Sequence, residues 1–234
     1  MKLSVILPTY NEERTIQKLL NSVLNVRFPP ESGPVEVEVI VVDDGSTDRT
    51  AEIVALEPRA KLVRHERNSG KGAAIRTALG CVTGDVVLIQ DADLEYSVED
   101  YPRLLRPFLD ERVQAVFGSR FLLRRHPTGM RWTHRLANRI LTLTANLLYD
   151  AKLTDEATCY KVFRAPLIKS LPLRANGFDF CPEVTALLRK RGVPIHEVPI
   201  EYRARSRAEG KKIRFKHGFE AMKTLVLCRF QGRR

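Results

Sequence analysis

Apolar runs that alternate with helical stripes are the feature that most constrains the fold of this chain. Between these runs, apolar residues recur at i, i+3, i+4 and i+7, which is the spacing of one helix face, as in 16–24 and 98–109. Strand and helix therefore alternate, and this part of the chain predicts an α/β fold, a parallel sheet covered by helices. The five runs that read as buried strands are 3–10, 35–46, 61–66, 84–93 and 113–120.

Polar residues gather where four of these strands end, at 9–12, 43–44, 91–93 and 118–120. A single aspartate pair at a strand end would suit an ordinary turn. In open parallel sheets, however, ligands bind outside the carboxyl ends of the strands. Because polar residues follow four different strands, we predict a binding site along the edge where these strands end.

The second half of the chain is less regular. The mostly apolar segment 136–149 predicts a helix that lies either on a membrane or beneath a neighbouring segment. Pro194 and Pro199 favour an edge strand within 193–206. The remaining expectations are a loop and strand over 154–164, a loop and helix over 177–192, a basic loop over 207–218 and a final helix over 219–230.

Composition limits the class of protein. The chain has 234 residues, 44% of them hydrophobic, which suffices for one large core. No run of about 18 apolar residues is present, so we expect no transmembrane helix. The first residues turn polar too soon for a signal peptide. Four cysteines without a CxxC pair favour reduced thiols in the cytosol over a disulfide frame or a zinc site.

The net charge of +11 is concentrated in two segments. Residues 200–234 hold 11 Lys and Arg against 3 acids, and residues 120–149 hold six arginines and no acid. Such blocks favour a surface for phosphate-bearing partners, with solubility alone as the alternative.

Asp91 and Asp93 end the apolar run VVLIQDADLEY (86–96). A buried carboxylate costs several kcal/mol unless it is paired or holds a metal. Two carboxylates one residue apart can present oxygens to one Mg²⁺ or Mn²⁺, ions that usually bind substrate phosphates as well. The pair therefore points to a diphosphate-bearing substrate. The loop NSGKGAA (68–74) lacks both GxGxxG and the P-loop spacing, and neither GxSxG nor HExxH occurs.

Several motifs together resemble family 2 glycosyltransferases, in order and over nearly the whole chain. Within that family, the pattern is similar to the dolichyl- or polyprenyl-phosphate mannose and glucose synthases. The resemblance implies a GT-A fold, a nucleotide-sugar-binding α/β sandwich forming a single domain over 1–234. Residues 1–120 would bind the nucleotide sugar, and 121–234 would provide the acceptor side and a basic C-terminal helix. The motifs are PTYNE (8–12), VVDDGSTDRT (41–50), GKG (70–72), DADLE (91–95), GSR (118–120), Asp155 with Tyr160, and EGKKI (209–213).

The same resemblance assigns site residues. Asp91 and Asp93, with Ala92 between them, would hold the metal and the diphosphate, and Arg120 would approach the sugar or a phosphate. Glu95 stands where relatives often have Gln, which leaves the sugar open. The candidates for binding the nucleotide and its phosphates are Pro8, Tyr10, Asn11, Glu12, Val42, Asp44, Lys71, Arg207, Lys211 and Lys212.

The implied reaction is metal-dependent, inverting transfer of mannose or glucose from a GDP- or UDP-sugar to a polyprenyl or dolichyl phosphate. Breaking the sugar–diphosphate bond builds negative charge that Mg²⁺ or Mn²⁺ and Lys or Arg can stabilise. A lipid phosphate is already an anion and needs little general-base help. We expect peripheral contact with an anionic membrane at its cytoplasmic face, a separate membrane protein as a further candidate partner, and no nucleic acid. The C-terminal transmembrane pair found in some relatives has no counterpart in this sequence.

Other functions stay open at this point. Transfer to a saccharide or another soluble hydroxyl would need a protein base, for which Asp155 and Glu183 are the candidates. A sugar-phosphate nucleotidyltransferase would typically carry a Gly- and Arg-rich signature after the first strand, where this chain has PTYNEE. A non-catalytic nucleotide-sugar-binding protein would not need Asp91, Asp93 and the basic loop together.

Overall fold

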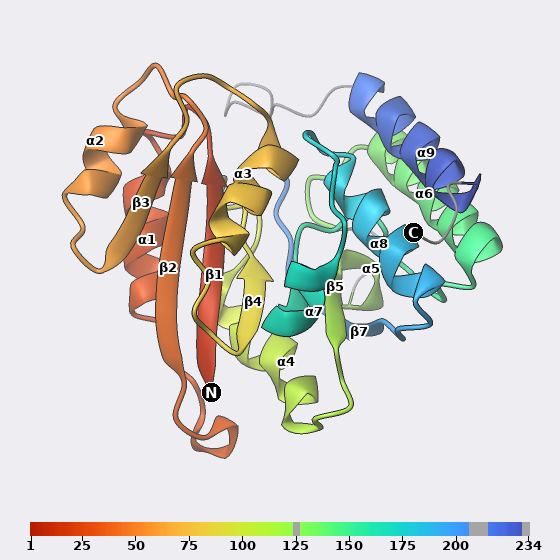
Figure 1. Ribbon diagram of the computed structural model, residues 1–234, viewed down its shortest axis with the longest axis horizontal. Helices are drawn as coiled ribbons and strands as arrows, with labels where there is room; N and C mark the ends of the chain where they lie inside the picture. The colour runs from red at the N-terminus through yellow and green to blue at the C-terminus, as the bar shows by residue number, and fades with distance from the viewer. Residues whose placement is uncertain (124–126, 206–214, 231–234) are drawn as a thin grey trace.

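The computed structural model describes residues 1–123, 127–205 and 215–230, and these form a seven-stranded sheet with helices on both faces (Figure 1). The strands are β1 Lys2–Thr9, β2 Glu36–Asp43, β3 Ala60–Arg64, β4 Val86–Ile89, β5 Ala115–Ser119, β6 Lys161–Arg164 and β7 His196–Pro199. The helices are α1 Ile16–Leu24, α2 Thr50–Ala55, α3 Lys71–Leu79, α4 Tyr101–Leu105, α5 Arg120–Leu123, α6 Trp132–Tyr149, α7 Ala165–Ser170, α8 Phe180–Lys190 and α9 Phe215–Phe230. Short 3₁₀ turns cover Pro30–Ser32, Val98–Asp100 and Arg106–Leu109.

The strand order is β3-β2-β1-β4-β6-β5-β7. The pairs β1–β2, β1–β4, β2–β3 and β5–β7 are parallel, which confirms the mostly parallel sheet. The exception is β6, which runs antiparallel between β4 and β5. A strand was predicted within 154–164, where β6 lies, but its antiparallel direction was not predicted. As predicted, β7 lies at an edge of the sheet.

Side chains alternate between the two faces along each strand, as the period of two requires. On β2, Ile40 and Val42 enter the core beneath α3, α7 and α8, whereas Val39 and Val41 enter the core beneath α1, α2 and α4. The helices α6 and α9 lie side by side at the end of the molecule away from β3 (Figure 1). Both faces of the sheet are thus covered.

Two helices differ from the prediction. The helix α6 has both a buried and an exposed apolar side, since Leu141 and Ala145 are buried while Leu136 and Leu143 are exposed. Its packing beneath a neighbouring segment is thus confirmed, and contact with a membrane stays a prediction. The helix α9 begins at Phe215, so the last part of the predicted basic loop 207–218 is helical. The rest of that loop lies outside the described residues. Within the part of the chain that is described, no helix is both long and apolar enough to cross a bilayer.

Two buried ionisable residues follow α6, Glu156 in the loop before β6 and Lys161 at the start of β6. Lys161 donates through Nζ to the backbone oxygen of Glu156 at 3.1 Å, and the ammonium lies 3.6 Å from the centre of the Phe117 ring. Glu156 accepts a bond from the Thr185 hydroxyl at 2.9 Å, while its Oε2 has no hydrogen-bond partner in the described part of the chain. Burial raises the pKa of Glu156 to about 7, against the opposing pull of Lys161.

The raised pKa makes stability depend on pH in a defined direction. An unfolded glutamate titrates near 4.5, so between pH 4.5 and 7 the folded state keeps a proton that the unfolded state has lost. Stability from this group is therefore complete below pH 4.5 and is lost as the pH rises to 7. The gap corresponds to about 3 kcal/mol, at about 1.4 kcal/mol for each pH unit.

We expect Glu156→Gln to abolish this dependence. Between pH 5 and pH 8 the free energy of unfolding of the wild type should fall by about 3 kcal/mol relative to the variant, measured by chemical denaturation. The exposed Glu52→Gln on α2 is the control and should track the wild type at both pH values. Parallel curves for wild type and Glu156→Gln would show that Glu156 is not neutral in the fold.

Candidate functional site

The carboxyl ends of β1, β2, β4 and β5 meet at one edge of the sheet, at the top of Figure 1. Each of these strands is followed by one of the polar segments noted in the sequence. Pro8 and Thr9 end β1 in register with Val42 and Asp43 of β2. Across this edge run the glycine loop before α3 and the segment after β7.

Asp44 organises the glycine loop. Its carboxylate accepts bonds from the backbone N–H groups of Ser69 at 2.9 Å and Gly70 at 2.8 Å, and lies 2.7 Å from His65 Nδ1. Gly70 has φ +97°, and a Cβ at this position would lie 2.3 Å from the backbone oxygen of Asn176. The glycine is therefore required both by its backbone angle and by the close approach of the 175–177 loop.

Lys71 opens α3 and forms an ion pair with Asp91. Its Nζ also lies 3.1 Å from Cys159 Sγ. Burial alone would lower the pKa of Lys71, but the adjacent Asp91 carboxylate holds it well above its usual value. The lysine thus stays charged and neutralises the first aspartate of the DADLE segment.

Arg205 neutralises the second aspartate. Its guanidinium lies 3.3 Å from Asp93 Oδ2 and donates to both oxygens of Glu12 at 3.1 and 3.2 Å. Its backbone N–H donates to Glu95 at 2.7 Å, and the other oxygen of Glu95 accepts from the Tyr202 hydroxyl at 2.6 Å. The Nε of Arg205 is buried and has no hydrogen-bond partner among the described residues. Burial, with Asp91 and Glu95 nearby, raises the pKa of Asp93 to about 7.

Arg205 was not predicted as a site residue. The basic segment 200–234 was recognised, but nothing in the sequence separates Arg205 from Arg203 or Arg207. The predicted basic residues Arg207, Lys211 and Lys212 lie outside the described residues.

Asp91 and Asp93 are the residues that would hold a divalent ion. Their hard carboxylate oxygens suit Mg²⁺ or Mn²⁺. Across 1–123, 127–205 and 215–230, no group of three or more His, Cys, Asp or Glu side chains is placed to hold a metal. An ion held by two carboxylates takes its other ligands from water and from phosphate, which is the usual arrangement for Mg²⁺. The donor set therefore fits a metal that arrives with a diphosphate.

Arg120 and Asp155, both predicted as catalytic, are brought together as one buried pair. Asp155 accepts from Arg120 Nε and Nη2, each at 2.7 Å, and from its backbone N–H at 3.0 Å. Asn138 of α6 donates a further bond to Asp155 at 2.9 Å. The guanidinium carbon lies 5.0 Å from the centre of the Tyr202 ring. Asp155 uses only two nitrogens of the side chain, so Nη1 is not engaged by it.

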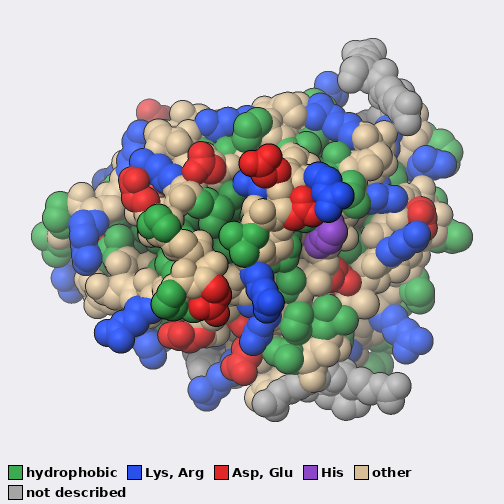
Figure 2. Space-filling model, turned by 90° about the horizontal axis from the view of Figure 1, so that it is seen from below, with side chains coloured by type: hydrophobic (Ala, Val, Ile, Leu, Met, Phe, Trp, Pro, Cys, Tyr) green, Lys and Arg blue, Asp and Glu red, His purple; other side chains and the backbone are tan. Residues whose placement is uncertain are grey.

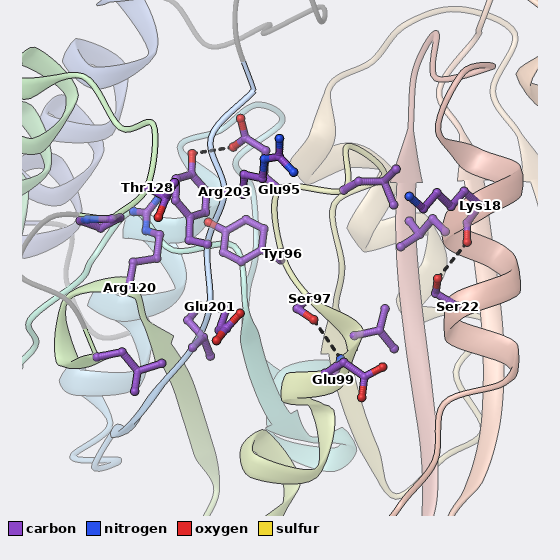
Figure 3. A pocket seen from close by; sticks show the side chains of 17 residues that line it. Lys18, Ser22, Glu95, Tyr96, Ser97, Glu99, Arg120, Thr128, Glu201 and Arg203 are labelled. Carbon is purple, nitrogen blue, oxygen red and sulfur yellow. Dashed lines mark hydrogen bonds between the residues drawn. The ribbon is translucent and has the colours of Figure 1, made fainter.

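Arg120 lines a pocket of about 430 Å³ between α1, the segment after Asp93 and the segment after β7 (Figure 3). Lys18 and Ser22 of α1 stand at one side, and Arg120 and Glu95 at the other. Apolar side chains and charges of both signs share the lining, so the pocket suits an amphipathic molecule better than a bare anion. The apolar members include Leu19, Leu94, Val98, Leu123, Pro127 and Ile200.

The remaining residues predicted to bind the nucleotide differ in how accessible their side chains are. Val42 is 0% exposed within the core, so its side chain offers no surface to a ligand. Ala92 is almost fully buried between the two aspartates. Asn11 accepts from the backbone N–H of Thr47 at 2.8 Å, and Tyr10 beside it is partly exposed.

Glu183 and Asp155 were the candidate bases for a soluble hydroxyl acceptor. Glu183, on α8, accepts from the backbone N–H groups of Arg174 at 2.8 Å and Ala175 at 2.9 Å. Both of its oxygens are thus used in holding the loop beside the glycine loop. Asp155 is 0% exposed and fully engaged with Arg120 and Asn138. In this arrangement neither carboxylate reaches an incoming hydroxyl.

Comparison with known proteins shows which sequences and folds this chain is similar to. Residues 4–171 match the model of the family described as glycosyl transferase family 2. A UDP-N-acetylglucosamine–dolichyl-phosphate N-acetylglucosaminyltransferase of Methanococcus voltae is 27% identical over 248 residues, which cover 96% of this chain and 95% of that protein. A dolichol-phosphate mannosyltransferase of Pyrococcus furiosus is 26% identical, covering 99% of this chain and 65% of that protein.

Among solved structures, glucosyl-3-phosphoglycerate synthase from Mycobacterium tuberculosis is similar in fold. Its complex with Mn²⁺, UDP-glucose and phosphoglyceric acid has a TM-score of 0.75 and 26% identity, covering 97% of this chain and 79% of that one. The mostly parallel sheet with flanking helices matches the GT-A fold of this neighbour, which confirms the predicted fold class.

Arg205 competes with a metal ion for Asp93, and this competition can be measured. We expect Arg205→Gln to bind Mn²⁺, in the absence of nucleotide, about tenfold more tightly than the wild type, because a positive charge beside the ligand is removed. Electron paramagnetic resonance of free Mn²⁺ measures the affinity directly. Arg203→Gln, two residues away and without a bond to Asp93, should leave it unchanged. Equal or weaker binding by Arg205→Gln would mean that Arg205 does not oppose the metal.

Proposed function

This chain belongs to glycosyltransferase family 2, and from that membership we propose that it transfers a hexose from a nucleotide-diphosphate sugar to a polyprenyl or dolichyl phosphate. The family makes it a glycosyltransferase. The lipid-phosphate acceptor, the hexose and the divalent ion are the proposed part. In this reaction the strand ends within 1–120 would bind the donor together with Arg205. The pocket lined by Arg120, which draws residues from both 1–120 and 121–234, would take the acceptor.

The donor half of the proposal rests on the carboxylates at the strand ends and their cations. Asp91 and Asp93 would hold Mg²⁺ or Mn²⁺ against the donor diphosphate, and the ion stabilises charge on the departing nucleoside diphosphate. Lys71 and Arg205 lie beside these aspartates and place two further positive charges at the same point. The fold neighbour crystallised with Mn²⁺ and UDP-glucose supports a GDP- or UDP-sugar donor.

The acceptor half rests on one observation: the carboxylates predicted as bases are already engaged. Asp155 is locked to Arg120, and Glu183 holds backbone N–H groups. An acceptor that arrives ionised needs no base, and a phosphate monoester is an anion at neutral pH. Arg120 would orient that anion from the wall of the pocket, while the apolar wall accommodates the first part of a prenyl chain. Attack in one step would invert the anomeric centre.

Membrane contact is the part of the proposal that α6 and α9 support. On α6 an exposed apolar stripe spans roughly 80° of the helix at about 100° per residue, opposite the buried face. It consists of Trp132, Leu136, Ile140, Leu143 and Leu147, of which Leu147 is 86% exposed. On α9, Phe219, Val226, Leu227 and Phe230 form a similar stripe. We call these nine residues the α6/α9 apolar face.

Charge around this face favours an anionic bilayer as its partner. Arg131, Arg135 and Arg139 flank the stripe on α6, which contains no acid, and Lys223 and Arg229 lie on α9. Each Lys or Arg near an anionic leaflet contributes about 1 kcal/mol. The edge with the amino ends of the strands differs, because there Lys and Arg are interspersed with Asp and Glu (Figure 2). We therefore propose peripheral binding to the cytoplasmic leaflet, with a separate membrane protein as the competing occupant.

A soluble phosphate-bearing acceptor is the second candidate, favoured by the phosphoglyceric acid in the fold neighbour. The acceptor test supplies GDP- and UDP-sugars with Mn²⁺, and either a polyprenyl phosphate in vesicles or 3-phosphoglycerate. Organic extraction separates a glycolipid product from a soluble one. We expect a glycolipid product, and loss of more than a hundredfold in turnover for Asp93→Asn at saturating donor and metal. Product on 3-phosphoglycerate alone would replace the lipid acceptor, and near-normal turnover of Asp93→Asn would refute the metal site.

Docking has its own test, because Trp132 is the single tryptophan of the chain and lies on the α6/α9 apolar face. We expect its fluorescence to shift to the blue on mixing with anionic vesicles, and to respond less as salt rises. The double variant Leu136→Glu, Leu143→Glu should remain in the supernatant when vesicles are sedimented. Leu56→Glu, at an 81% exposed leucine after α2, is the matched control and should sediment like the wild type. No sedimentation of the wild type on any vesicle would direct attention to a protein partner.

A further inference from the structure

A row of polar side chains on α6 faces the active site. Asn138, Thr142 and Asn146 are spaced four residues apart, so they lie on one face of the helix, one turn after another. All three bond the segment 153–157. We call these three residues the α6 polar ladder.

The bonds of the ladder are short and continuous. Asn146 accepts from the backbone N–H of Leu153 and donates to its oxygen, each at 2.8 Å. The Thr142 hydroxyl accepts from the backbone N–H of Glu156 at 3.0 Å. Asn138 accepts from the backbone N–H of Ala157 at 2.9 Å and donates to Asp155 at 2.9 Å. Every turn of this part of α6 is therefore tied to the segment that carries Asp155.

That segment is held from the other side by β7. Glu197 accepts from the backbone N–H groups of Thr154 at 2.8 Å and Asp155 at 3.1 Å. Asp155 in turn fixes Arg120 through bonds of 2.7 Å. The Ser119 and Thr185 hydroxyls also bond this segment. The position of Arg120 in the pocket thus depends, among other contacts, on a first support, Glu197 on the sheet, and on a second, the ladder on α6. Only the second support belongs to an element with an exposed apolar stripe.

The helix is therefore two-sided. The apolar stripe from Trp132 to Leu147 faces away from the core, and the ladder lies on the buried side of the same helix. The helix α6 packs against α8 and α9. A shift of α6 relative to α8 and α9 would also move Asp155, because the two are joined by hydrogen bonds. Such bonds weaken steeply once they are stretched or bent.

We propose that α6 couples lipid docking to the active site, with Asn138 as a positioning residue that sets Arg120 through Asp155. The inference rests on the proposed function and adds its regulation. A ligand shifts a conformational equilibrium only if it binds one conformation better than the other. A bilayer that contacts the stripe favours the position of α6 in which all hydrogen bonds of the ladder are formed. Arg120 then takes up the orientation that receives the acceptor phosphate. Away from the bilayer the enzyme binds the donor normally but binds the acceptor weakly.

The experiment separates docking from coupling by using a water-soluble acceptor. Geranyl phosphate is supplied in solution, and transfer from the donor sugar is measured with and without anionic vesicles that contain no acceptor. We expect vesicles to increase the wild-type rate severalfold, chiefly by lowering the KM for geranyl phosphate. The shift of Trp132 fluorescence reports docking in the same samples.

Asn138→Ala should remove the stimulation by vesicles, raise the KM for the acceptor about tenfold and leave the KM for the donor unchanged. It should still sediment with vesicles. Thr142→Val keeps the shape of the side chain and removes one bond of the ladder, so it should lose part of the stimulation even if Asn138→Ala folds poorly. Thr144→Ala is the matched control, because the Thr144 hydroxyl bonds the oxygen of Ile140 on its own helix, at 2.9 Å, and not the segment 153–157.

The outcomes distinguish this inference from the proposed function. A wild type that makes glycolipid and docks, but is not stimulated, would overturn the coupling alone. Stimulation retained in both Asn138→Ala and Thr142→Val would do the same. A wild type that transfers nothing to any prenyl phosphate would overturn the proposed acceptor itself, and one that transfers without docking would overturn docking and coupling together.

Discussion

Buried carboxylates at the carboxyl ends of the strands need positively charged partners. The arrangement of the site follows from which Lys and Arg side chains provide those charges. Removing a charge from water costs several kcal/mol unless a partner compensates. Asp91 pairs with Lys71 of α3, Asp93 with Arg205 after β7, and Asp155 with Arg120 of α5. Each cation comes from a segment far away in the sequence. The ion pairs therefore fix the glycine loop, the DADLE segment and the segment after β7 relative to one another at the edge of the sheet.

The sequence was sufficient for those parts of the fold that depend on local pattern. The alternation of apolar runs and helical stripes predicted the parallel strands, and Pro194 and Pro199 placed the last strand at an edge. The strand β6 lies within the predicted loop and strand 154–164, but its antiparallel place between β4 and β5 was not predicted. That pairing depends on tertiary contacts, among them those of the buried Lys161 with Glu156 and Phe117. The two apolar faces of α6 could not be assigned either, since periodicity does not say which face meets the core.

For the candidate site, the types of residue were predictable and their pairings were not. Asp91, Asp93 and Arg120 were identified from spacing and from resemblance. That Asp155 would hold Arg120 and be held in turn by Asn138 depends on contacts across 35 and 17 positions. Arg205 was missed because three arginines alternate over 203–207, and only the fold turns one of them toward Glu12 and Asp93. Val42 was assigned by its motif, yet the pleat of β2 turns its side chain into the core.

Engagement of Asp155 and Glu183, the two carboxylates predicted as bases, has a consequence for acceptor choice. A site with no base to deprotonate a hydroxyl favours acceptors that arrive as anions. Lipid phosphates and small soluble phosphates both satisfy this condition, so charge alone does not choose between them. The two acceptor classes are distinguished by the apolar side of the pocket and by the α6/α9 apolar face, because a small hydrophilic acceptor would contact neither. If the acceptor is a lipid phosphate, the same helix that contacts the bilayer also supports the arginine that receives the phosphate, and the membrane becomes part of the specificity of the enzyme.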